Sequence, residues 1–415
     1  MTTHQAISTP IVKPVDGLCN LSCSYCYASG LGKRTGKNRM RPEVLKAMID
    51  FFCRYQDNIE FIWHGGEPLL AGIDFYCKAV EYQQVWEQKG RKITNSVQTN
   101  ATLVTSEWTN FFAKHDFFVG VSLDGPRDFH DRVRYYPDKT GSYDNVMKGI
   151  KLLRQADIFN GIICGVSTVN HQFPKEIFNF FITKGIKKLK FARVKDIGHC
   201  NDVSSLTISP KQYADFMIAI FDLWLELDDP EVEIRDIQSV VNLILGGNKR
   251  ECIYMGGCDQ FVTVYHDGSI YGCDSFPKIN ALSFGNVMDD SALIRSDPHL
   301  KSFRETLRKR RVNCQMCDWG FICKGGCAKD CYAQLNSIQP MDKVCENLKR
   351  YFEHISGKIK SYGLAITESS KSLTKGGEDH VKSHSKNQSQ SHPKSSSSSQ
   401  KRSNDTGHGE RQTLG

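Results

Sequence analysis

The stretch CNLSCSYCY, residues 19–27, decides how this 415-residue chain is interpreted. It places Cys19, Cys23 and Cys26 in the spacing C-x3-C-x2-C, directly after the first predicted strand. Three thiolates on one loop suit a [4Fe–4S] cluster in which one iron has no protein ligand and can bind a substrate. Zinc is an alternative, but it normally takes four Cys or His ligands, and no fourth ligand is obvious here. Thiols without a common role are the third interpretation.

Working outward from this loop, apolar runs that end in polar or Gly-rich turns alternate with helix-like segments from residue 7 to about 195. This alternation predicts six βα units, a parallel sheet and an α/β fold class. The predicted strands are Ile11–Val15, Ile59–Trp63, Ile93–Gln98, Phe117–Leu123, Ile162–Thr168 and Leu189–Val194. An amphipathic helix is predicted at Pro42–Tyr55, and two further helices are predicted within 210–248, broken near residues 228–230.

Polar residues follow the predicted strands at the ends where parallel βα proteins carry their chemistry. The motif Gly65-Gly66-Glu67-Pro68 follows the second strand, Gln98-Thr99-Asn100 the third, and Ser122 with Asp124 the fourth. We therefore expect all of these residues to lie together at the carboxyl end of the sheet. Two glycines and a proline are also usual turn residues, so an ordinary turn is the alternative for residues 65–68.

The sixteen cysteines are the informative part of the composition. No apolar run is long enough to span a membrane and the N-terminus has no signal sequence, so a cytoplasmic protein is predicted. A reducing compartment favours thiolate ligands over disulfides. The net charge of +8 is a weak argument for a nucleic-acid partner, because residues 371–415 carry eight Lys/Arg against four Asp/Glu.

A second module rich in Gly and Cys is predicted from residue 250 to about 350. We expect metal to hold it together, because it lacks the periodicity of long apolar helix faces. Eight of its thiols suffice for two fully ligated [4Fe–4S] clusters, with zinc-ribbon ligation as the alternative. They are Cys252, Cys258, Cys273, Cys314, Cys317, Cys323, Cys327 and Cys345. The polar segment from residue 367 onward is predicted to be disordered.

The first loop, with its C-x3-C-x-aromatic-C pattern, resembles that of the radical S-adenosylmethionine (SAM) enzymes. This resemblance implies a partial (β/α)6 barrel in which the open iron chelates SAM. It also implies that Tyr25 lies near the adenine and that Gly65, Gly66 and Glu67 present backbone to the methionine amino group. Ser122 and Arg134 would hold the SAM carboxylate. Loop packing is the alternative for Tyr25, and a surface salt bridge is the alternative for Arg134.

A narrower resemblance, over residues 7–360, is to the anaerobic sulfatase-maturating enzymes and their SPASM auxiliary-cluster domain. It implies that one auxiliary cluster takes Cys252, Cys258, Cys273 and Cys327, and the other Cys314, Cys317, Cys323 and Cys345. It also makes Asp274, beside Cys273, the catalytic base. Because thiolate-bound clusters are negatively charged, we expect the pKa of Asp274 to be raised. A turn or capping residue is the alternative.

The implied reaction oxidises a Cys or Ser of a sulfatase to Cα-formylglycine without oxygen. The open cluster reduces SAM, the resulting radical removes a Cβ hydrogen, Asp274 takes the thiol or hydroxyl proton, and an electron passes to the auxiliary clusters. Three [4Fe–4S] clusters and SAM are the implied cofactors. The implied partners are the sulfatase polypeptide and an electron donor such as a flavodoxin or ferredoxin, and a monomer is expected.

The domains expected from these observations are a barrel at 1–235, a linker helix with the SPASM domain at 236–366, and the tail at 367–415. Only 18 residues precede Cys19, which we take as too few for a leader-recognition domain. A related enzyme that crosslinks or epimerises another peptide is one rival, and a non-enzymatic iron–sulfur carrier is another. Cys331 could replace a ligand, whereas Cys53, Cys77, Cys164 and Cys200 are expected to act as small apolar side chains.

Overall fold

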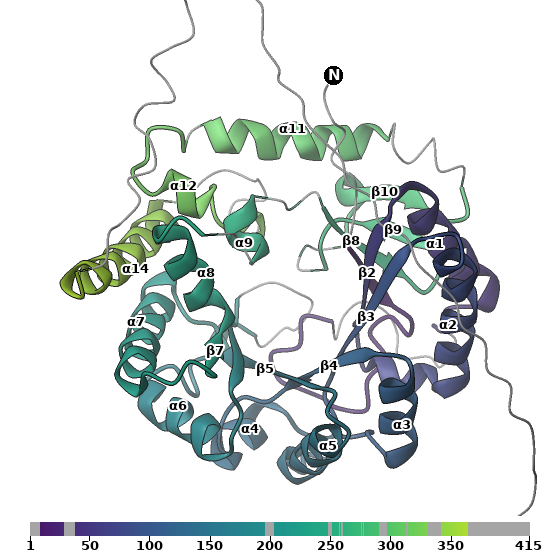
Figure 1. Ribbon diagram of the computed structural model, residues 1–415, viewed down its shortest axis with the longest axis horizontal. Helices are drawn as coiled ribbons and strands as arrows, with labels where there is room; N and C mark the ends of the chain where they lie inside the picture. The colour runs from purple at the N-terminus through teal and green to yellow at the C-terminus, as the bar shows by residue number, and fades with distance from the viewer. Residues whose placement is uncertain are drawn as a thin grey trace, which may run out of the picture. The chain divides into compact units, whose positions relative to one another are not determined.

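The computed structural model describes residues 9–28, 38–195, 203–247, 251–256, 258, 260–274, 276, 278–289, 297–312, 314–330 and 342–363. Residues 1–369 form one unit of the chain and residues 370–415 a second. The predicted disordered tail therefore lies outside the described residues. Within the first unit, ten strands form one sheet in the order β10-β9-β8-β1-β2-β3-β4-β5-β6-β7 (Figure 1).

The first six strands are the predicted ones, and each pairs in parallel with the next. They are β1 Thr9–Lys13, β2 Asn58–Trp63, β3 Lys92–Thr99, β4 Phe117–Ser122, β5 Phe159–Val166 and β6 Lys188–Arg193. Their bounds differ from the prediction by up to three residues. The helices between them are α1 Pro42–Tyr55, α2 Ile73–Glu87, α3 Ser106–Lys114, α4 Arg127–Val133, α5 Tyr143–Gln155 and α6 Pro174–Thr183, with the 3₁₀ helix η1 at Pro68–Ala71.

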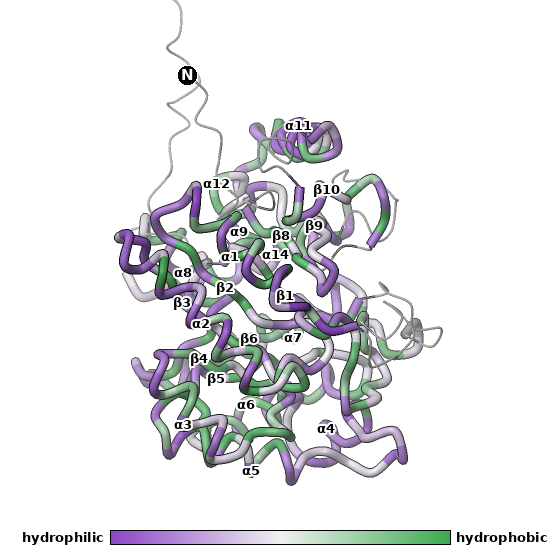
Figure 2. Tube along the Cα trace, turned by 90° about the vertical axis from the view of Figure 1, so that its right-hand side faces the viewer, coloured by the Kyte–Doolittle hydropathy of each residue, from purple (hydrophilic) through white to green (hydrophobic). Residues whose placement is uncertain are grey.

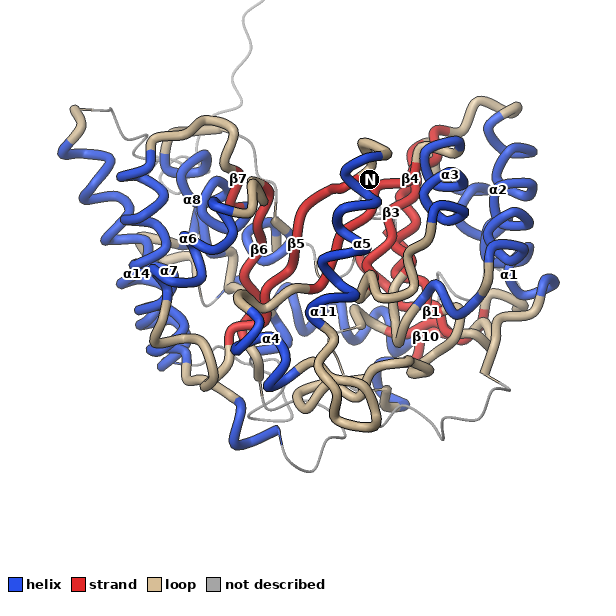
Figure 3. Tube along the Cα trace, turned by 90° about the horizontal axis from the view of Figure 1, so that it is seen from below, coloured by secondary structure: helices blue, strands red, loops and turns tan. Residues whose placement is uncertain are grey.

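The helices cover the outer side of a curved sheet (Figure 3). In this view α1, α2 and α3 lie outside one arm of the sheet, and α6 and α7 (Pro210–Leu227) lie outside the other. Large aromatic side chains fill the layer between the sheet and its helices. Phe52, Phe61, Trp63 and Phe112 are fully buried there. Burial of this apolar surface stabilises the sheet and leaves the carboxyl ends of its strands to carry the polar residues.

The sheet is wider than predicted, because four short strands extend it. Strand β7, Glu233–Ile234, follows the predicted break after α7, pairs in parallel with β6 and leads into α8, Arg235–Ile244. On the other edge, β8 (Phe261–Tyr265) runs parallel to β1. Strands β9 (Ser269–Tyr271) and β10 (Ser283–Asn286) add antiparallel pairs beside it. The cysteine-rich segment is therefore joined to the barrel sheet by hydrogen bonds.

The expectation that the cysteine-rich segment lacks apolar faces is wrong. Helix α11, Pro298–Val312, buries Leu300, Phe303 and Leu307, and hydrophilic and hydrophobic stretches alternate along it in Figure 2. Helix α14, Asp342–Ser361, is buried at Phe352, Ile355 and other apolar positions, and it packs against α7. Sequence reasoning overlooked these faces because basic residues interrupt them.

The remaining short elements of the cysteine-rich segment are α9 at Cys252–Met255, α12 at Gly320–Cys323 and the 3₁₀ helix η3 at Asn280–Leu282. A further 3₁₀ helix, η2, lies at Val203–Leu206. Among the described residues, none of the helices has the length and apolar character needed to cross a membrane.

Candidate active site

The three cysteines of the first motif lie on the loop that follows β1, at the carboxyl end of the sheet. Burial, with a smaller contribution from the neighbouring thiols of the same loop, raises the pKa of Cys19 to about 12 and that of Cys23 to about 11. The Leu21 N–H and the Asn100 amide donate to Cys19 Sγ over 3.4 and 3.7 Å. The loop thus groups three thiols and offers hydrogen bonds to one of the sulfurs.

Glycines of the GGEP motif let the β1 loop and the β2 end touch backbone to backbone. The Gly66 N–H donates to the Asp16 carbonyl over 2.7 Å, and the Glu67 N–H donates to the Leu18 carbonyl over 2.8 Å. A Cβ atom on Gly66 would stand 2.0 Å from the Leu18 carbonyl oxygen, which no side chain tolerates. The motif therefore fixes the path of the chain just before Cys19.

The Glu67 side chain is fully buried and ties this motif to the end of β3. Its Oε1 accepts from Thr99 Oγ1 over 2.7 Å and from the Leu69 N–H over 3.1 Å, and its Oε2 accepts from the Asn100 N–H over 2.8 Å. Burial raises the pKa of Glu67 to about 7, although these hydrogen bonds oppose the rise. The carboxyl group of Glu67 thus holds the GGEP motif against the end of β3.

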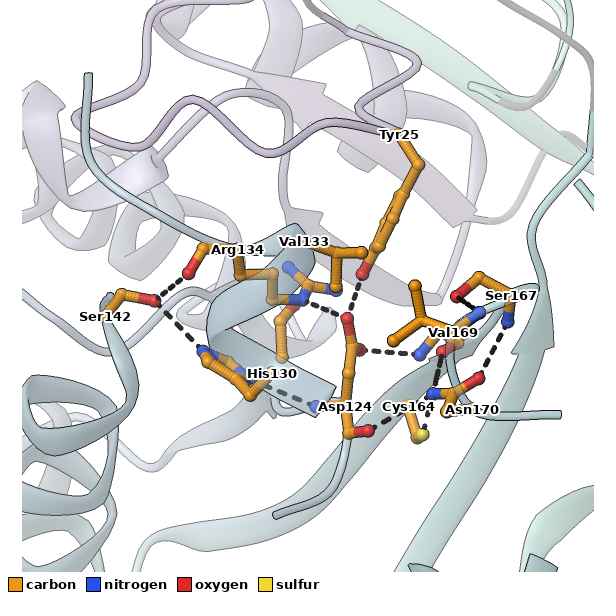
Figure 4. Close-up of polar contacts among 12 residues, drawn as sticks. Tyr25, Asp124, His130, Val133, Arg134, Ser142, Cys164, Ser167, Val169 and Asn170 are labelled. Atoms are coloured by element: carbon orange, nitrogen blue, oxygen red, sulfur yellow. Dashed lines mark hydrogen bonds and ion pairs between the residues drawn. The ribbon is translucent and has the colours of Figure 1, made fainter. Parts of the chain in front are cut away.

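Asp124, in the turn between β4 and α4, contacts several polar groups of the site (Figure 4). Its Oδ2 accepts a hydrogen bond from Tyr25 Oη and pairs with Arg134 Nε at 2.9 Å, while its Oδ1 accepts from the Gly165 N–H over 2.7 Å. The Arg134 guanidinium also lies over the Tyr25 ring, 5.3 Å from its centroid. Sequence reasoning placed Asp124 at the strand end but did not assign it this role.

His130 also contacts the turn that carries Asp124. It is neutral, because burial lowers its pKa to about 3. Ser142 Oγ donates to the Arg134 carbonyl over 2.9 Å, so it accepts from His130 Nε2 over 3.0 Å. His130 Nδ1 is then unprotonated and accepts the Asp124 N–H over 3.3 Å. This chain of hydrogen bonds locks the turn that carries Asp124 and the backbone that carries Arg134.

Ser122 and Arg134 have different partners in the structure. Ser122 Oγ accepts a hydrogen bond from Gln98 Nε2 over 3.2 Å, and Arg134 pairs with Asp124. The surface salt bridge considered for Arg134 is wrong, since the side chains of Arg134 and Asp124 are 13% and 0% exposed. Among the described residues, the two Nη atoms of Arg134 have no hydrogen-bond partner, which leaves them free for a bound carboxylate.

Asp274 lies next to the first cysteine loop. Its Oδ2 accepts a hydrogen bond of 2.5 Å from Tyr27 Oη and lies 4.0 Å from His64 Nδ1. Burial alone would raise the pKa of Asp274, but His64, Lys13, Tyr27 and other neighbours lower it to about 2. These neighbouring protein groups act against the rise that was expected from the clusters, and that expectation stays a prediction.

Lys13 is the main feature of the site that sequence reasoning missed. It ends β1 and is fully buried, with its Nζ 5.1 Å from the Tyr27 ring centroid and 5.3 Å from that of Tyr265. Burial lowers its pKa, whereas Asp274, Asp16 and the nearby thiols oppose this change. The available signal was a lysine at the end of an apolar strand, where a charge is seldom buried without a partner.

The eight downstream cysteines gather in two groups. Burial, with a smaller contribution from the Cys327 thiol, raises the pKa of Cys252 to about 12 and that of Cys258 to about 11. Lys329 lies within electrostatic reach of Cys327 and also of Cys273, which connects the fourth thiol to this group. These neighbours are far apart in sequence.

The second group forms around Cys323. Burial, with smaller contributions from the thiols of Cys345 and Cys314, raises its pKa to about 12. The Cys317 thiol raises the pKa of Cys314, and the Cys314 and Cys317 thiols raise that of Cys345, so these side chains are close enough to interact electrostatically. The assignment of these thiols to two auxiliary clusters, which the family resemblance implied, stays a prediction.

The other cysteines differ from one another. Cys53 and Cys164 are buried and behave as apolar side chains, whereas Cys77 is exposed, contrary to that expectation. Cys200 and Cys331 lie outside the described residues. In the described part of the chain, every cysteine is a free thiol, and no three His, Cys, Asp or Glu side chains converge closely enough to hold one metal ion.

The grouped thiols fit iron–sulfur clusters by the chemistry of their donors. Each thiolate of a [4Fe–4S] cluster binds a different iron, so its ligands need only surround the cluster and do not converge on one ion. Three thiols on one loop, beside buried carboxylates, arginine and aromatic rings, make a site for a cluster and a ligand with charged and aromatic parts. Residues 16–181 match the Radical SAM superfamily. The fold and this site thus define a radical SAM enzyme, with one [4Fe–4S] cluster and SAM as its family cofactors.

The particular family follows from full-length relatives. A Cysteine-type anaerobic sulfatase-maturating enzyme of Clostridium perfringens (strain 13 / Type A) is 30% identical over 353 residues, which cover 83% of this chain and 95% of that protein. The Serine-type enzyme of Bacteroides thetaiotaomicron is 29% identical over 381 residues, covering 86% and 92%. The chain therefore belongs to the anaerobic sulfatase-maturating enzymes.

A solved structure of the same kind agrees in fold. It is described as native anSMEcpe with bound AdoMet and Cp18Cys peptide. The match has a TM-score of 0.77 at 29% identity and covers 85% of this chain and 98% of that one. The predicted fold class, a radical SAM α/β barrel followed by a cysteine-rich auxiliary region, is confirmed. The division of the chain at residues 235 and 366 stays a prediction.

Proposed function

We propose that this chain oxidises a Cys or Ser side chain in the active-site segment of a sulfatase to Cα-formylglycine, without oxygen. One observation carries the proposal: the Asp274 carboxylate is hydrogen-bonded to Tyr27, which directly follows Cys26. The proposed base therefore lies between the first cysteine loop and Cys273 of the auxiliary region. A substrate side chain held there would meet both the source of the radical and the proton acceptor.

The cofactor positions in this proposal follow the thiol groups. Cys19, Cys23 and Cys26 would hold the open cluster, and two further clusters would take the two downstream sets of four cysteines. When bound, the open cluster and SAM supply the radical that removes a hydrogen atom from the target Cβ. The count of three clusters is part of the proposal.

Arg134, Tyr25 and the GGEP backbone are proposed to orient SAM. Asp124 holds Arg134 by its Nε, so the two Nη atoms are available for the SAM carboxylate in a forked geometry. Tyr25 is fixed by the same carboxylate, and a Cβ atom on Gly165 would stand 2.7 Å from Tyr25 Oη, so only glycine leaves room for it. Ser122, held by Gln98, is the proposed second contact of the carboxylate.

Asp274 is proposed to take the thiol or hydroxyl proton of the substrate. Cys273 Sγ donates to Asp274 Oδ1 over 3.6 Å, and a Cys273 thiolate would no longer do so, which leaves Oδ1 to accept the substrate proton. The proton transfer is proposed to follow removal of the Cβ hydrogen, when the substrate gives up a proton together with an electron.

The remaining partners complete the proposal. A sulfatase polypeptide is the substrate, a flavodoxin or ferredoxin is the electron donor, and the chain acts as a cytoplasmic monomer. The free thiols among the described residues support a reducing compartment. Neither nucleic acid nor membrane has a part in this activity.

The proposal is tested by mass spectrometry of a sulfatase peptide after incubation with SAM and dithionite under anaerobic conditions. The expected product is an aldehyde, formed together with 5′-deoxyadenosine. Asp274→Asn should lose most of the aldehyde while it still produces 5′-deoxyadenosine. Undiminished aldehyde from this variant would remove Asp274 from the role of base.

The same experiment separates the rival functions. A crosslinked or epimerised peptide would indicate another member of the superfamily, and no 5′-deoxyadenosine would indicate an electron carrier without enzymatic activity. Iron and sulfide analysis of the reconstituted protein tests the number of clusters, with about twelve of each expected for three [4Fe–4S] clusters.

A further inference from the structure

Helix α11 presents exposed basic side chains, and two exposed apolar side chains lie at its C-terminal end and in the turn after it. We call this surface the α11 patch and define it by Lys301, Arg308, Lys309, Val312 and Met316. All five side chains are exposed, with Val312 at 54% and Met316 at 95%. Met316 is the most exposed of the large apolar side chains in the described part of the chain.

The positive charge of this region exceeds what its fold requires. Residues 298–318 contain six Lys/Arg against only Glu305 and Asp318. Arg310 and Arg311 are turned inward, where they donate to the carbonyls of Gly325 and Gly256. These two arginines hold the cysteine-bearing turns against α11.

The outer cations remain in solvent. Arg308 and Lys309 are 74% and 75% exposed, and both use the same carboxylate, Glu305, as their partner. One carboxylate neutralises only one of the two charges, and Lys301 adds another cation on the exposed side of the helix. The α11 patch is therefore a net positive surface.

The apolar part of the patch adjoins the second group of thiols. Met316 lies between Cys314 and Cys317 in sequence, and the turn is closed by hydrogen bonds from the Cys317 N–H to the Cys314 carbonyl and from the Gly320 N–H to the Cys317 carbonyl. The exposed Met316 thus belongs to the turn that carries Cys314 and Cys317, two of the proposed ligands of one auxiliary cluster. An electron that enters or leaves at this turn would cross the α11 patch.

We propose that the α11 patch is the docking surface for an acidic electron-carrier protein, with Met316 and Val312 at the centre of the contact and Arg308, Lys309 and Lys301 at its rim. The inference deepens the proposed function and rests on it. One electron crosses per contact, so that the carrier is oxidised by one electron as the cluster is reduced, or the reverse. The proposed reaction takes one electron to cleave SAM and returns one when the substrate radical becomes an aldehyde or thioaldehyde.

Charge complementarity selects the partner. A carrier with an acidic face is attracted over about 10 Å at moderate ionic strength, and such attraction raises the rate of encounter. A small apolar centre with a charged rim suits a transient complex, because electron-transfer contacts lie at the small end of protein interfaces. A second copy of this chain would instead bring two positive patches together.

The test measures binding of an oxidised, acidic flavodoxin to the cluster-loaded enzyme under anaerobic conditions. Arg308→Glu/Lys309→Glu should weaken binding about tenfold or more, and salt should weaken binding of the wild-type enzyme more than that of the variant. The matched control is Lys148→Glu/Lys151→Glu on α5, which makes the same change in charge. These lysines are exposed on a helix at the far end of the molecule from α11 (Figures 1 and 2). The control should bind flavodoxin like the wild type.

Activity assays distinguish failure of this inference from failure of the proposed function. Driven by dithionite, wild-type and both variant enzymes should form the aldehyde equally well; driven by reduced flavodoxin, only the α11 variant should be slow. If dithionite gives no aldehyde with the wild type, the proposed function fails. If dithionite works but the α11 variant binds flavodoxin as well as the control does, or the wild type binds none, the docking inference is overturned.

Discussion

The buried ion pair between Asp124 and Arg134 offers the sharpest test of how the SAM side of the site is built. Asp124→Asn keeps the shape of the side chain but removes its charge. If the amide oxygen stays towards Tyr25 and Arg134, the amide nitrogen faces the Gly165 N–H, which now donates to Asp124 Oδ1 over 2.7 Å. The variant therefore leaves a buried guanidinium without its counter-charge and sets two donors against each other.

The magnitude follows from burial. Breaking a buried ion pair by removing one partner costs about 3–5 kcal/mol, because the remaining charge stays buried without compensation. The side chains of Asp124 and Arg134 are 0% and 13% exposed, so this range applies in full. At about 2 °C per kcal/mol for a large domain, the unfolding temperature should fall by roughly 6–10 °C. We also expect SAM binding to weaken, because Arg134 and Tyr25 lose the group that positions them.

The assay is anaerobic thermal unfolding of the reconstituted enzyme, together with SAM binding by calorimetry. Asp144→Asn is the matched control, because Asp144 pairs with Arg127 at the surface, where the two side chains are 76% and 50% exposed. This control should show no measurable change in either assay. Equal unfolding temperatures and equal SAM affinities for the two variants would refute the role assigned to Asp124.

Three further predictions concern single positions. Because burial raises the pKa of Glu67 to about 7, from about 4.5 in the unfolded chain, the stabilisation of the protonated form, roughly 3 kcal/mol, should be lost progressively as the pH rises from about 4.5 to 7, and stability should then level off. Urea unfolding between pH 4 and 8 checks this, and Glu67→Gln should remove the dependence. Tyr27→Phe removes the donor to Asp274, so formylglycine yield per SAM cleaved should fall; an unchanged ratio would contradict the contact. Gly66→Ala should lose the cluster absorbance, since its Cβ would meet the Leu18 carbonyl, while Gly357→Ala, with nothing within 4 Å, should retain it.

The sequence predicted the order of the barrel well, because six apolar strands alternate with amphipathic helices. Helix α1 has the predicted bounds, Pro42–Tyr55, since Pro42 at its first turn and a regular apolar face mark it clearly. Strands β7 and β9 were missed because two or three residues are too few to show periodicity. Basic residues such as Lys309 and Arg310 obscured the apolar face of α11.

The sequence predicted the local motifs of the site, but it did not predict which side chains from distant segments contact one another. The cysteine spacing and the GGEP motif are local and visible, so the loop after β1 could be named from residue types. The partnership of Asp124 with Arg134 and Tyr25, and that of Asp274 with Tyr27, join segments that are close only in the folded chain. The pKa of Asp274 depends on His64 and Lys13 in the same way, and the sequence did not show that these two side chains lie near it.

The central claim is that this chain removes a hydrogen atom from the Cβ of its target residue with a radical made from SAM. The direct measurement uses a sulfatase peptide whose target Cys or Ser carries deuterium at Cβ, incubated anaerobically with SAM and dithionite. Mass spectrometry should find deuterium in 5′-deoxyadenosine and an aldehyde in the peptide, in equal amounts. An aldehyde formed while 5′-deoxyadenosine remains unlabelled, or SAM cleavage with the peptide unchanged, would contradict this account.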